Sequence, residues 1–167
     1  MADPAQQVHP IPPLFDSASE VLILGSFPSV KSREARFFYG HPQNRFWPLM
    51  AALTDRPVPQ SIAEKTALIL DNRFALWDSI GSCTVAGSAD STIRDVTPND
   101  LSLILDHAPI RAIFCNGNTS YRYFHRYIEP QLSRTARVLP STSPANAAWS
   151  LERLIDAWRV ILDAQHR

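Results

Sequence analysis

The chain has 167 residues, which suits one domain of ordinary size and not two. Apolar residues make up 45% of the chain and charged residues 19%, so the sequence can form one substantial core. No apolar run approaches the roughly 20 residues that cross a bilayer, and residues 1–16 lack the layout of a signal peptide. We therefore expect a cytoplasmic protein that does not bind membranes.

Disulfide and metal chemistry have no support in the sequence. The two cysteines, Cys83 and Cys115, lie far apart in dissimilar surroundings, and the five histidines are scattered without paired spacing. We expect neither a metal nor any other cofactor.

The net charge is zero, with 16 basic and 16 acidic residues, which counts against a strong general attraction to nucleic acids. The basic residues nevertheless gather in two groups, between Lys31 and Arg45 and between Arg122 and Arg137. Solvated surface charge is the commoner explanation of any one group. A neutral protein with such groups can still hold DNA weakly and locally.

Hydrophobic patterns predict alternating strands and helices. The apolar run Val21–Leu24, followed by a glycine, is typical of a buried parallel strand that runs into a loop. Residues 78–97 have little periodicity and are rich in Gly, Ser and Asp, which predicts a long loop, and such loops are often functional. The other expected elements are helices over 45–54, 61–72, 98–107, 118–128 and 149–162, and strands over 74–77, 111–115 and 137–139.

This alternation predicts an α/β fold with a parallel sheet covered by helices on both faces. Residues 1–16 are expected to form a mostly irregular arm, and residues 17–167 a single domain. Parallel sheets bind ligands at the carboxyl ends of their strands. Here those ends lead into loops that follow Leu24, Trp77, Cys115 and Leu139.

The first motif, Gly25–Ser29, directly follows a predicted strand. Gly25 permits close approach of the backbone to a ligand, and Pro28 stiffens the loop so that backbone N–H groups can be aimed. A turn with Gly and Pro after a strand is also ordinary in proteins, so both interpretations stay open.

The second motif, residues 37–47, combines aromatic rings, amides, a histidine and an arginine within eleven positions. This mixture suits a pocket that stacks a flat ring and presents amides to its edge. Asn44, just ahead of an apolar helix, is equally consistent with a plain helix N-cap.

The third motif, residues 140–146, precedes the final predicted helix. Small hydroxyl residues at a helix N-terminus form a natural phosphate site through backbone N–H groups and the helix dipole. The alternative is that Ser143 or Asn146 merely caps the helix.

The three motifs resemble, in the same order, those of the uracil-DNA glycosylase superfamily. The string His-Pro-x-Asn-Arg-Phe-Trp at residues 41–47 strongly resembles mismatch-specific uracil-DNA glycosylases. Residues 25–29 and 87–93 more closely resemble the deoxyinosine (hypoxanthine) DNA glycosylase branch. The resemblance covers about residues 21–162. It implies a three-layer α/β/α sandwich with a central, mostly parallel four-stranded sheet.

In that family the first motif cradles the base, the aromatic residue ahead of His-Pro stacks on it, and the last motif grips the DNA backbone. We therefore expect a base pocket that includes Gly25, Ser26, Phe27, Pro28, Tyr39, His41, Asp90, Ser91 and Asn116. We expect a DNA-binding surface that includes Lys31, Arg45, Ser141, Ser143, Pro144, Ala145 and Asn146. The last motif has Pro144 and Ala145 where many relatives carry a leucine wedge.

Phe27 stands where mismatch-specific relatives keep a water-positioning Asn, and Phe27 cannot polarise water. In the deoxyinosine branch an Asn outside the first motif takes over, and Asn44 is the matching residue. The resemblance thus implies that the Asn44 amide oxygen orients the water that attacks C1′. Backbone N–H groups around Ser26 and Phe27 would stabilise charge on the leaving base. His41 either bonds to the base or to Asn44, or supports the loop.

The predicted function is a monofunctional, monomeric DNA glycosylase that flips a deaminated base, hypoxanthine or uracil, out of DNA. Two alternatives stay open: a uracil-specific enzyme of G·U mismatches or single strands, and a non-catalytic domain that binds damaged DNA. A serine hydrolase has no support, because the chain lacks a G-x-S-x-G motif.

Overall fold

The computed structural model describes residues 5–165, apart from the side chains of residues 5 and 90. Its centre is a four-stranded sheet in the order β3-β2-β6-β7, in which all neighbouring strands are parallel. The strands are β2 (Val21–Gly25), β3 (Phe74–Asp78), β6 (Ala112–Asn116) and β7 (Arg137–Leu139). Every residue of β2 and β3 is buried, because layers cover both faces of the sheet.

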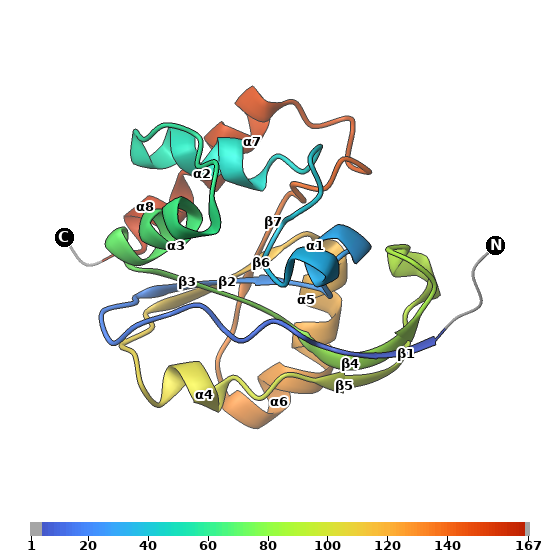
Figure 1. Ribbon diagram of the computed structural model, residues 1–167. Coiled ribbons are helices and arrows are strands. Elements are labelled where there is room, and N and C mark those ends of the chain that lie inside the picture. Colours follow the sequence, from blue (N-terminus) through green and yellow to red (C-terminus); the bar gives the residue numbers. More distant parts are fainter. Residues whose placement is uncertain (1–4, 166–167) are drawn as a thin grey trace.

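Helices lie on both sides of this sheet (Figure 1). On one side are α2 (Phe46–Thr54), α3 (Ile62–Asp71), α7 (Leu151–Trp158) and α8 (Val160–Asp163). On the other side are α4 (Ser102–Leu105) and a longer helix made of α5 (Asn118–Tyr123), a π-helical turn (Phe124–Ile128) and α6 (Glu129–Leu132). The predicted three-layer α/β/α sandwich with a parallel four-stranded sheet is confirmed.

The order of the strands creates a place for a ligand. From β2 the chain passes through α1 (Val30–Ala35), α2 and α3 to β3, on one side of β2. From β6 it passes through α5 and α6 to β7, on the opposite side. The direction of winding therefore reverses between β2 and β6, and a crevice at such a reversal is the usual ligand site of an open parallel sheet.

The structure also contains a second, antiparallel sheet that the sequence pattern did not predict. It consists of β1 (Ala5–Val8), β4 (Ile80–Val85) and β5 (Arg94–Pro98), in the order β1-β4-β5. Residues 5–8 are therefore not irregular, and residues 78–97 are not one long loop but two strands joined by a short 3-10 turn. Register shifts between β4 and β5 disturb the alternation by which strands are recognised.

Two helix boundaries also differ from expectation. The helix expected from residue 98 is the shorter α4, because residues 94–98 belong to β5. The final helix begins at Leu151, where Ser150 is the N-cap, and is divided at Arg159 into α7 and α8. Within residues 5–165, no helix is both long enough and apolar enough to span a bilayer.

Candidate active site

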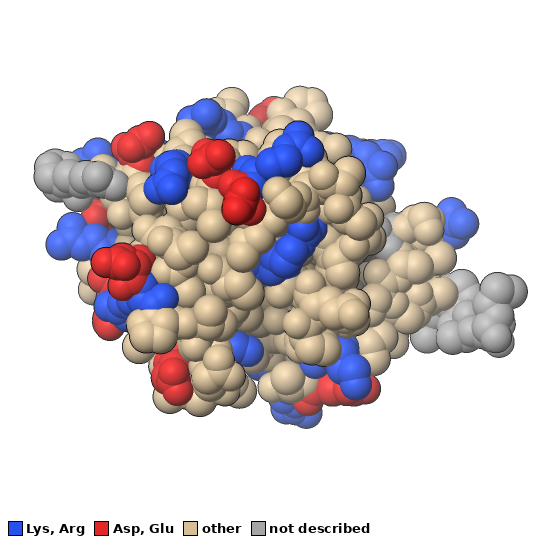
Figure 2. Space-filling view, turned by 90° about the horizontal axis from the view of Figure 1, so that it is seen from above, with Lys and Arg blue, Asp and Glu red and all other residues tan. Residues whose placement is uncertain are grey.

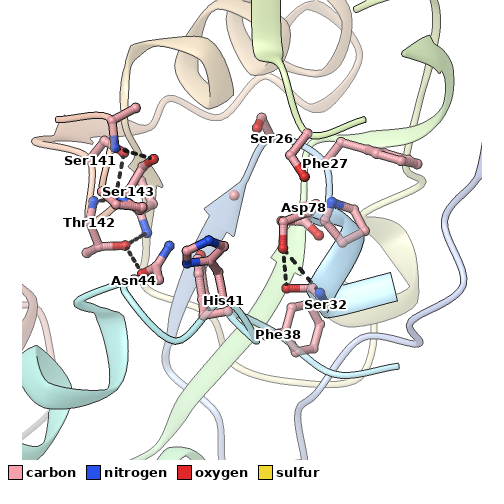
Figure 3. Close-up of a pocket in the computed structure, with 18 of the residues that line it drawn as sticks. Ser26, Phe27, Ser32, Phe38, His41, Asn44, Asp78, Ser141, Thr142 and Ser143 are labelled. Atoms are coloured by element: carbon pink, nitrogen blue, oxygen red, sulfur yellow. Dashed lines mark hydrogen bonds between the residues drawn. The ribbon is translucent and has the colours of Figure 1, made fainter. Parts of the chain in front are cut away.

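A pocket of about 400 Å³ opens at the carboxyl ends of β2, β3 and β6 (Figure 3). Its walls come mainly from three segments far apart in sequence: the loop after β2, the segment ahead of α2 and the loop after β7. The predicted residues that line it are Gly25, Ser26, Phe27, Pro28, Tyr39, His41, Asn44, Asn116, Ser141, Ser143, Pro144 and Ala145. The three sequence motifs thus form one cavity.

Other predicted residues do not line this cavity or cannot be assigned to it. Ser91 is exposed and does not line it, and the side chain of Asp90 lies outside the described residues. Lys31 is exposed on α1. Asn146 lines an adjoining groove of about 510 Å³. The segment between β4 and β5 reaches the pocket through residues 88–89.

Asn44 is held by hydrogen bonds that tie α2 to the loop after β7. Its Oδ1 atom accepts hydrogen bonds from the backbone N–H of Phe46 at 2.9 Å and from the hydroxyl of Thr142 at 2.8 Å. Thr142 in turn accepts a hydrogen bond from Nδ2 of Asn116 at 3.0 Å, and its backbone N–H donates to Oδ1 of Asn116 at 3.0 Å. Thr142 is fully buried, so the centre of this network is shielded from water while Asn44 and Asn116 line the pocket.

The orientation of the Asn44 side chain is set by these hydrogen bonds. The two donors use both lone pairs of Oδ1, so the amide nitrogen is the group that faces the pocket (Figure 3). An amide oxygen that already accepts two hydrogen bonds has little capacity left to accept a third from water. Asn44 does cap the first N–H of α2, as the alternative interpretation had it, and it lines the pocket as well.

Asp78 is a pocket residue that the sequence motifs miss. It is the last residue of β3 and lies across the pocket from Asn44 (Figure 3). Its side chain is 6% exposed, and Oδ2 lies 2.6 Å from Nε2 of His9, whose side chain is 3% exposed. A Cβ atom on the neighbouring Gly25 would lie 2.3 Å from Oδ1 of Asp78, so only glycine leaves room for this carboxylate. Its place at the end of a buried strand was the available sequence signal.

Tyr39 supports the pocket with its ring and brings an unpartnered hydroxyl. The ring stacks on Phe46 with centroids 3.9 Å apart. The buried hydroxyl makes no hydrogen bond with any described residue. Burial, together with the nearby Asp78 carboxylate, raises the pKa of this hydroxyl, and the Asn116 amide opposes the shift without reaching hydrogen-bond geometry. The pocket therefore holds a neutral phenol beside a buried carboxylate.

Arg45 holds the loop after β7 through its guanidinium group, and its contact with DNA stays a prediction. Its guanidinium donates hydrogen bonds to the carbonyls of Ser143 at 2.9 Å, of Asn146 at 3.0 Å and of Trp149. These bonds use three of its five N–H donors and turn the group toward the protein. Arg45 thus links the second motif to the third.

The hydroxyl groups of the third motif shape the loop rather than cap the helix. Ser150 caps α7, so neither Ser143 nor Asn146 does. The hydroxyl of Ser141 accepts a hydrogen bond from the N–H of Ser143 at 3.1 Å, and the side chain of Asn146 donates to the Ser141 carbonyl at 3.0 Å. Residues 140–146 therefore form a loop ahead of the final helix and do not lie at its N-terminus.

Two more predicted residues have defined surroundings. His41 lies between Asn44 and Asp78 in Figure 3, and its Nδ1 atom accepts a hydrogen bond from the N–H of Gln43 at 3.1 Å. This bond shows His41 supporting the loop while its ring lines the pocket. Phe27 is half-buried, and the guanidinium of Arg33 lies 5.6 Å above its ring.

Basic side chains do not form one continuous field on the face that Figure 2 presents. The Lys and Arg side chains there lie in small separate groups, several of them beside Asp or Glu. Electrostatic attraction of DNA to this face would therefore come from separate small groups of basic side chains and not from one extended positive surface. Among the side chains described, no group of three or more His, Cys, Asp or Glu residues could hold a metal ion.

Comparison with known proteins gives the family. The family model described as the Uracil DNA glycosylase superfamily matches residues 12–162. A protein named hypoxanthine DNA glycosylase from Methanosarcina acetivorans is 35% identical over 85% of this chain and 90% of its own length. One of the same name from Methanosarcina barkeri is 33% identical over 81% and 85%.

A solved structure agrees with these relatives. The solution NMR structure of a candidate uracil DNA glycosylase from Methanosarcina acetivorans matches with a TM-score of 0.78 and 32% identity. The match covers 93% of this chain and 97% of that one. The family model spans the three motifs that build the pocket, and the chain therefore belongs to the uracil DNA glycosylase superfamily.

Proposed function

We propose that this chain releases hypoxanthine, and also uracil, from DNA by hydrolysing the N-glycosidic bond, the step that starts base excision repair. The names of two relatives, at 33% and 35% identity, support hypoxanthine as the substrate. The observation that carries the proposal is the pocket, where the Asn44 amide faces the buried Asp78 carboxylate across a cavity lined by aromatic rings. A flat base with a polar edge suits these surroundings.

The target base must leave the duplex before it can enter this pocket. Extrusion costs a few kcal/mol, and less for a mispaired base, which a deaminated base usually is. Tyr39, whose ring is backed by Phe46, offers flat support, and Phe27 offers a second ring from the first motif. Stacking of a base on an aromatic side chain contributes about 1–3 kcal/mol, which is enough to offset much of the extrusion.

Asp78 can distinguish deaminated bases from their parents. A carboxylate only accepts hydrogen bonds. Hypoxanthine carries a proton on N1 and uracil carries one on N3, next to a carbonyl in each case, whereas adenine and cytosine have no proton on the matching nitrogen. The Oδ1 atom of Asp78 accepts no hydrogen bond from a described residue and lies against Gly25 in the pocket wall. It is the acceptor for this proton.

Bond cleavage needs a water near C1′ and a stabilised leaving base. Asn44 donates an N–H hydrogen bond to the oxygen of the water, which keeps a second lone pair for attack on C1′. The C1′–N bond breaks with its electron pair on the base, and the proton that the water loses ends on the released base. The carbonyls of Gly25 and Ser26 accept hydrogen bonds from the N–H groups of Ser79 at 2.8 Å and Ile80 at 3.1 Å, and these bonds fix the first motif. Fixed backbone N–H groups around Ser26 and Phe27 then stabilise negative charge on the leaving base.

The DNA backbone is held by the loop after β7, residues 141–146, and by Lys31. Arg45 keeps that loop in shape. Pro144 and Ala145 line the pocket and are small, so they push into the duplex less than a leucine would. We therefore expect stronger action on mispaired bases, which need less help to leave the stack.

The test is a base-release assay on duplex and single-stranded oligonucleotides that contain hypoxanthine, uracil or xanthine. We expect the wild type to release hypoxanthine and the Asn44→Ala variant to bind DNA without releasing any base. Release of uracil alone, from G·U pairs or single strands, would favour the uracil-specific alternative. Binding of damaged DNA by the wild type without release of any base would favour the non-catalytic alternative.

A further inference from the structure

His9 reaches the active site from the N-terminal segment, and we propose that it is a positioning residue that holds the Asp78 carboxylate in the orientation that accepts the base N–H. The inference rests on the function proposed above. His9 does not line the pocket, so it acts only through Asp78. The two residues are 69 positions apart in sequence.

The hydrogen bonds of His9 define its tautomer. Its Nδ1 atom accepts a hydrogen bond from the backbone N–H of Ile11 at 3.2 Å. A ring nitrogen that accepts carries no proton, so the ring proton is on Nε2. That nitrogen lies 2.6 Å from Oδ2 of Asp78, a short distance typical of a hydrogen bond to a carboxylate. His9 is thus a neutral imidazole oriented to donate to Asp78.

The surrounding segment fixes the ring. The N–H of His9 donates to the carbonyl of Gly81 at 2.7 Å, which extends the pairing of β1 with β4. The indole N–H of Trp77 donates to the carbonyl of Ile11 at 3.1 Å. The ring of His9 meets the rings of Phe27 and Trp77 edge to face, with centroids 5.8 and 6.1 Å apart. Packing and hydrogen bonds therefore hold His9 from several sides.

The consequence concerns the second oxygen of Asp78. A hydrogen bond to Oδ2 fixes the plane of the carboxylate and so fixes where Oδ1 points. Oδ1 then stays beside Gly25, where it meets a bound base. Without His9 the carboxylate can rotate and loses its only side-chain donor among the described residues. Selection for a base that carries an N–H should then weaken.

The experiment compares two substitutions of nearly equal length. His9→Gln keeps an N–H donor near the position of Nε2, whereas His9→Met has similar length and flexibility and no donor. Each variant is assayed for kcat/KM on two duplexes, one with 2′-deoxyinosine and one with 2′-deoxynebularine, whose base has no proton on N1 and no oxygen at C6. Leu14→Ala, which weakens the packing of the same segment at its bridge to Leu76, is the structural control.

The quantity compared is the ratio of kcat/KM on the deoxyinosine duplex to kcat/KM on the deoxynebularine duplex. We expect His9→Met to lower this ratio by about tenfold, the scale of one hydrogen bond to a charged group. His9→Gln should restore most of the ratio, and Leu14→Ala should leave it unchanged while lowering the melting temperature. In an Asp78→Ala background the His9→Met change should have no further effect on the ratio. NMR of imidazole nitrogens should show the proton on Nε2.

An unchanged ratio in a folded His9→Met variant would overturn the role of His9. So would a further loss of the ratio on adding His9→Met to Asp78→Ala. A wild type that releases no base from deoxyinosine DNA would instead defeat the proposed function. The two failures are therefore distinguishable.

Discussion

The hydroxyl of Thr142 donates a hydrogen bond to Oδ1 of Asn44 at 2.8 Å and joins two segments that lie 98 positions apart in sequence. The same hydroxyl accepts a hydrogen bond from Asn116. Because the hydroxyl fills both roles, Asn44 is held with its amide nitrogen toward the pocket. Thr142 thus couples the end of β6 to the start of α2.

Thr142→Val should lower the rate of base release by about fivefold, because one buried hydrogen bond contributes roughly 1 kcal/mol and the Asn44 amide becomes free to turn over. Single-turnover kinetics on deoxyinosine duplexes measure this rate. Thr142→Ser keeps the hydroxyl and should retain most of it. Equal rates for the valine and serine variants would show that the network does not orient Asn44.

Asn44→Asp tests whether catalysis needs the amide N–H of Asn44 as a hydrogen-bond donor or needs an oxygen acceptor at that position. One carboxylate oxygen can still accept from Phe46 and Thr142, while the other replaces the amide nitrogen in the pocket. If an N–H donor is needed, the aspartate variant should release base at least about a hundredfold more slowly, the usual scale for removing one catalytic donor. Activity equal to or above that of the wild type would show that the position works as an acceptor.

Lys31 and Arg45 should differ in the salt dependence of DNA binding. Lys31→Ala should lower the slope of log affinity against log salt by about 1, because it removes one phosphate contact. Arg45→Met should weaken binding by loosening the loop after β7 and leave that slope unchanged. Titrations by fluorescence anisotropy at several salt concentrations give both slopes. The reverse pattern would place Arg45, and not Lys31, on the phosphates.

Cys115 should make the fold sensitive to alkali. Burial raises the pKa of its thiol from 9.0 to about 12, and the Ser120 side chain opposes that shift. The unfolded chain loses this proton near pH 9 and the native state keeps it, so stability falls as pH rises toward 12. The slope is at most about 1.4 kcal/mol per pH unit.

Thermal melts measured between pH 8 and pH 11 check this expectation. The melting temperature of Cys115→Ala should fall less steeply with pH than that of the wild type. Tyr39, whose pKa burial also raises, contributes to the slope in both proteins and does not affect the comparison. Parallel curves would mean that the thiol is not held protonated by the fold.

The predictable parts of this protein are those with strong local patterns. The apolar run of β2 and the regular helices indicated a parallel α/β sheet, and the three motifs indicated where its strands end. The strands β4 and β5 could not be recognised within residues 78–97, because the register shifts after Ile80 and Ser82 break the two-residue alternation of polar and apolar side chains. Residues 5–8 are too few to show a pattern, and they form β1 only by pairing with β4.

The features of the site that the sequence could not predict depend on contacts between residues far apart in the chain. His9 and Asp78 meet because β1 brings the N-terminal segment beside the end of β3, and no spacing in the sequence indicates this. The inward amide nitrogen of Asn44 follows from its bond to Thr142 across the loop after β7. A motif can name such residues, but their hydrogen bonds decide which atom faces the substrate.

The most direct test of the central claim is to measure free base released from a duplex with one hypoxanthine, under single-turnover conditions and by mass spectrometry. We expect the wild type to release hypoxanthine and Asn44→Ala, bound to the same duplex, to release none. Full activity of Asn44→Ala, or release of no hypoxanthine by the wild type, would contradict that claim.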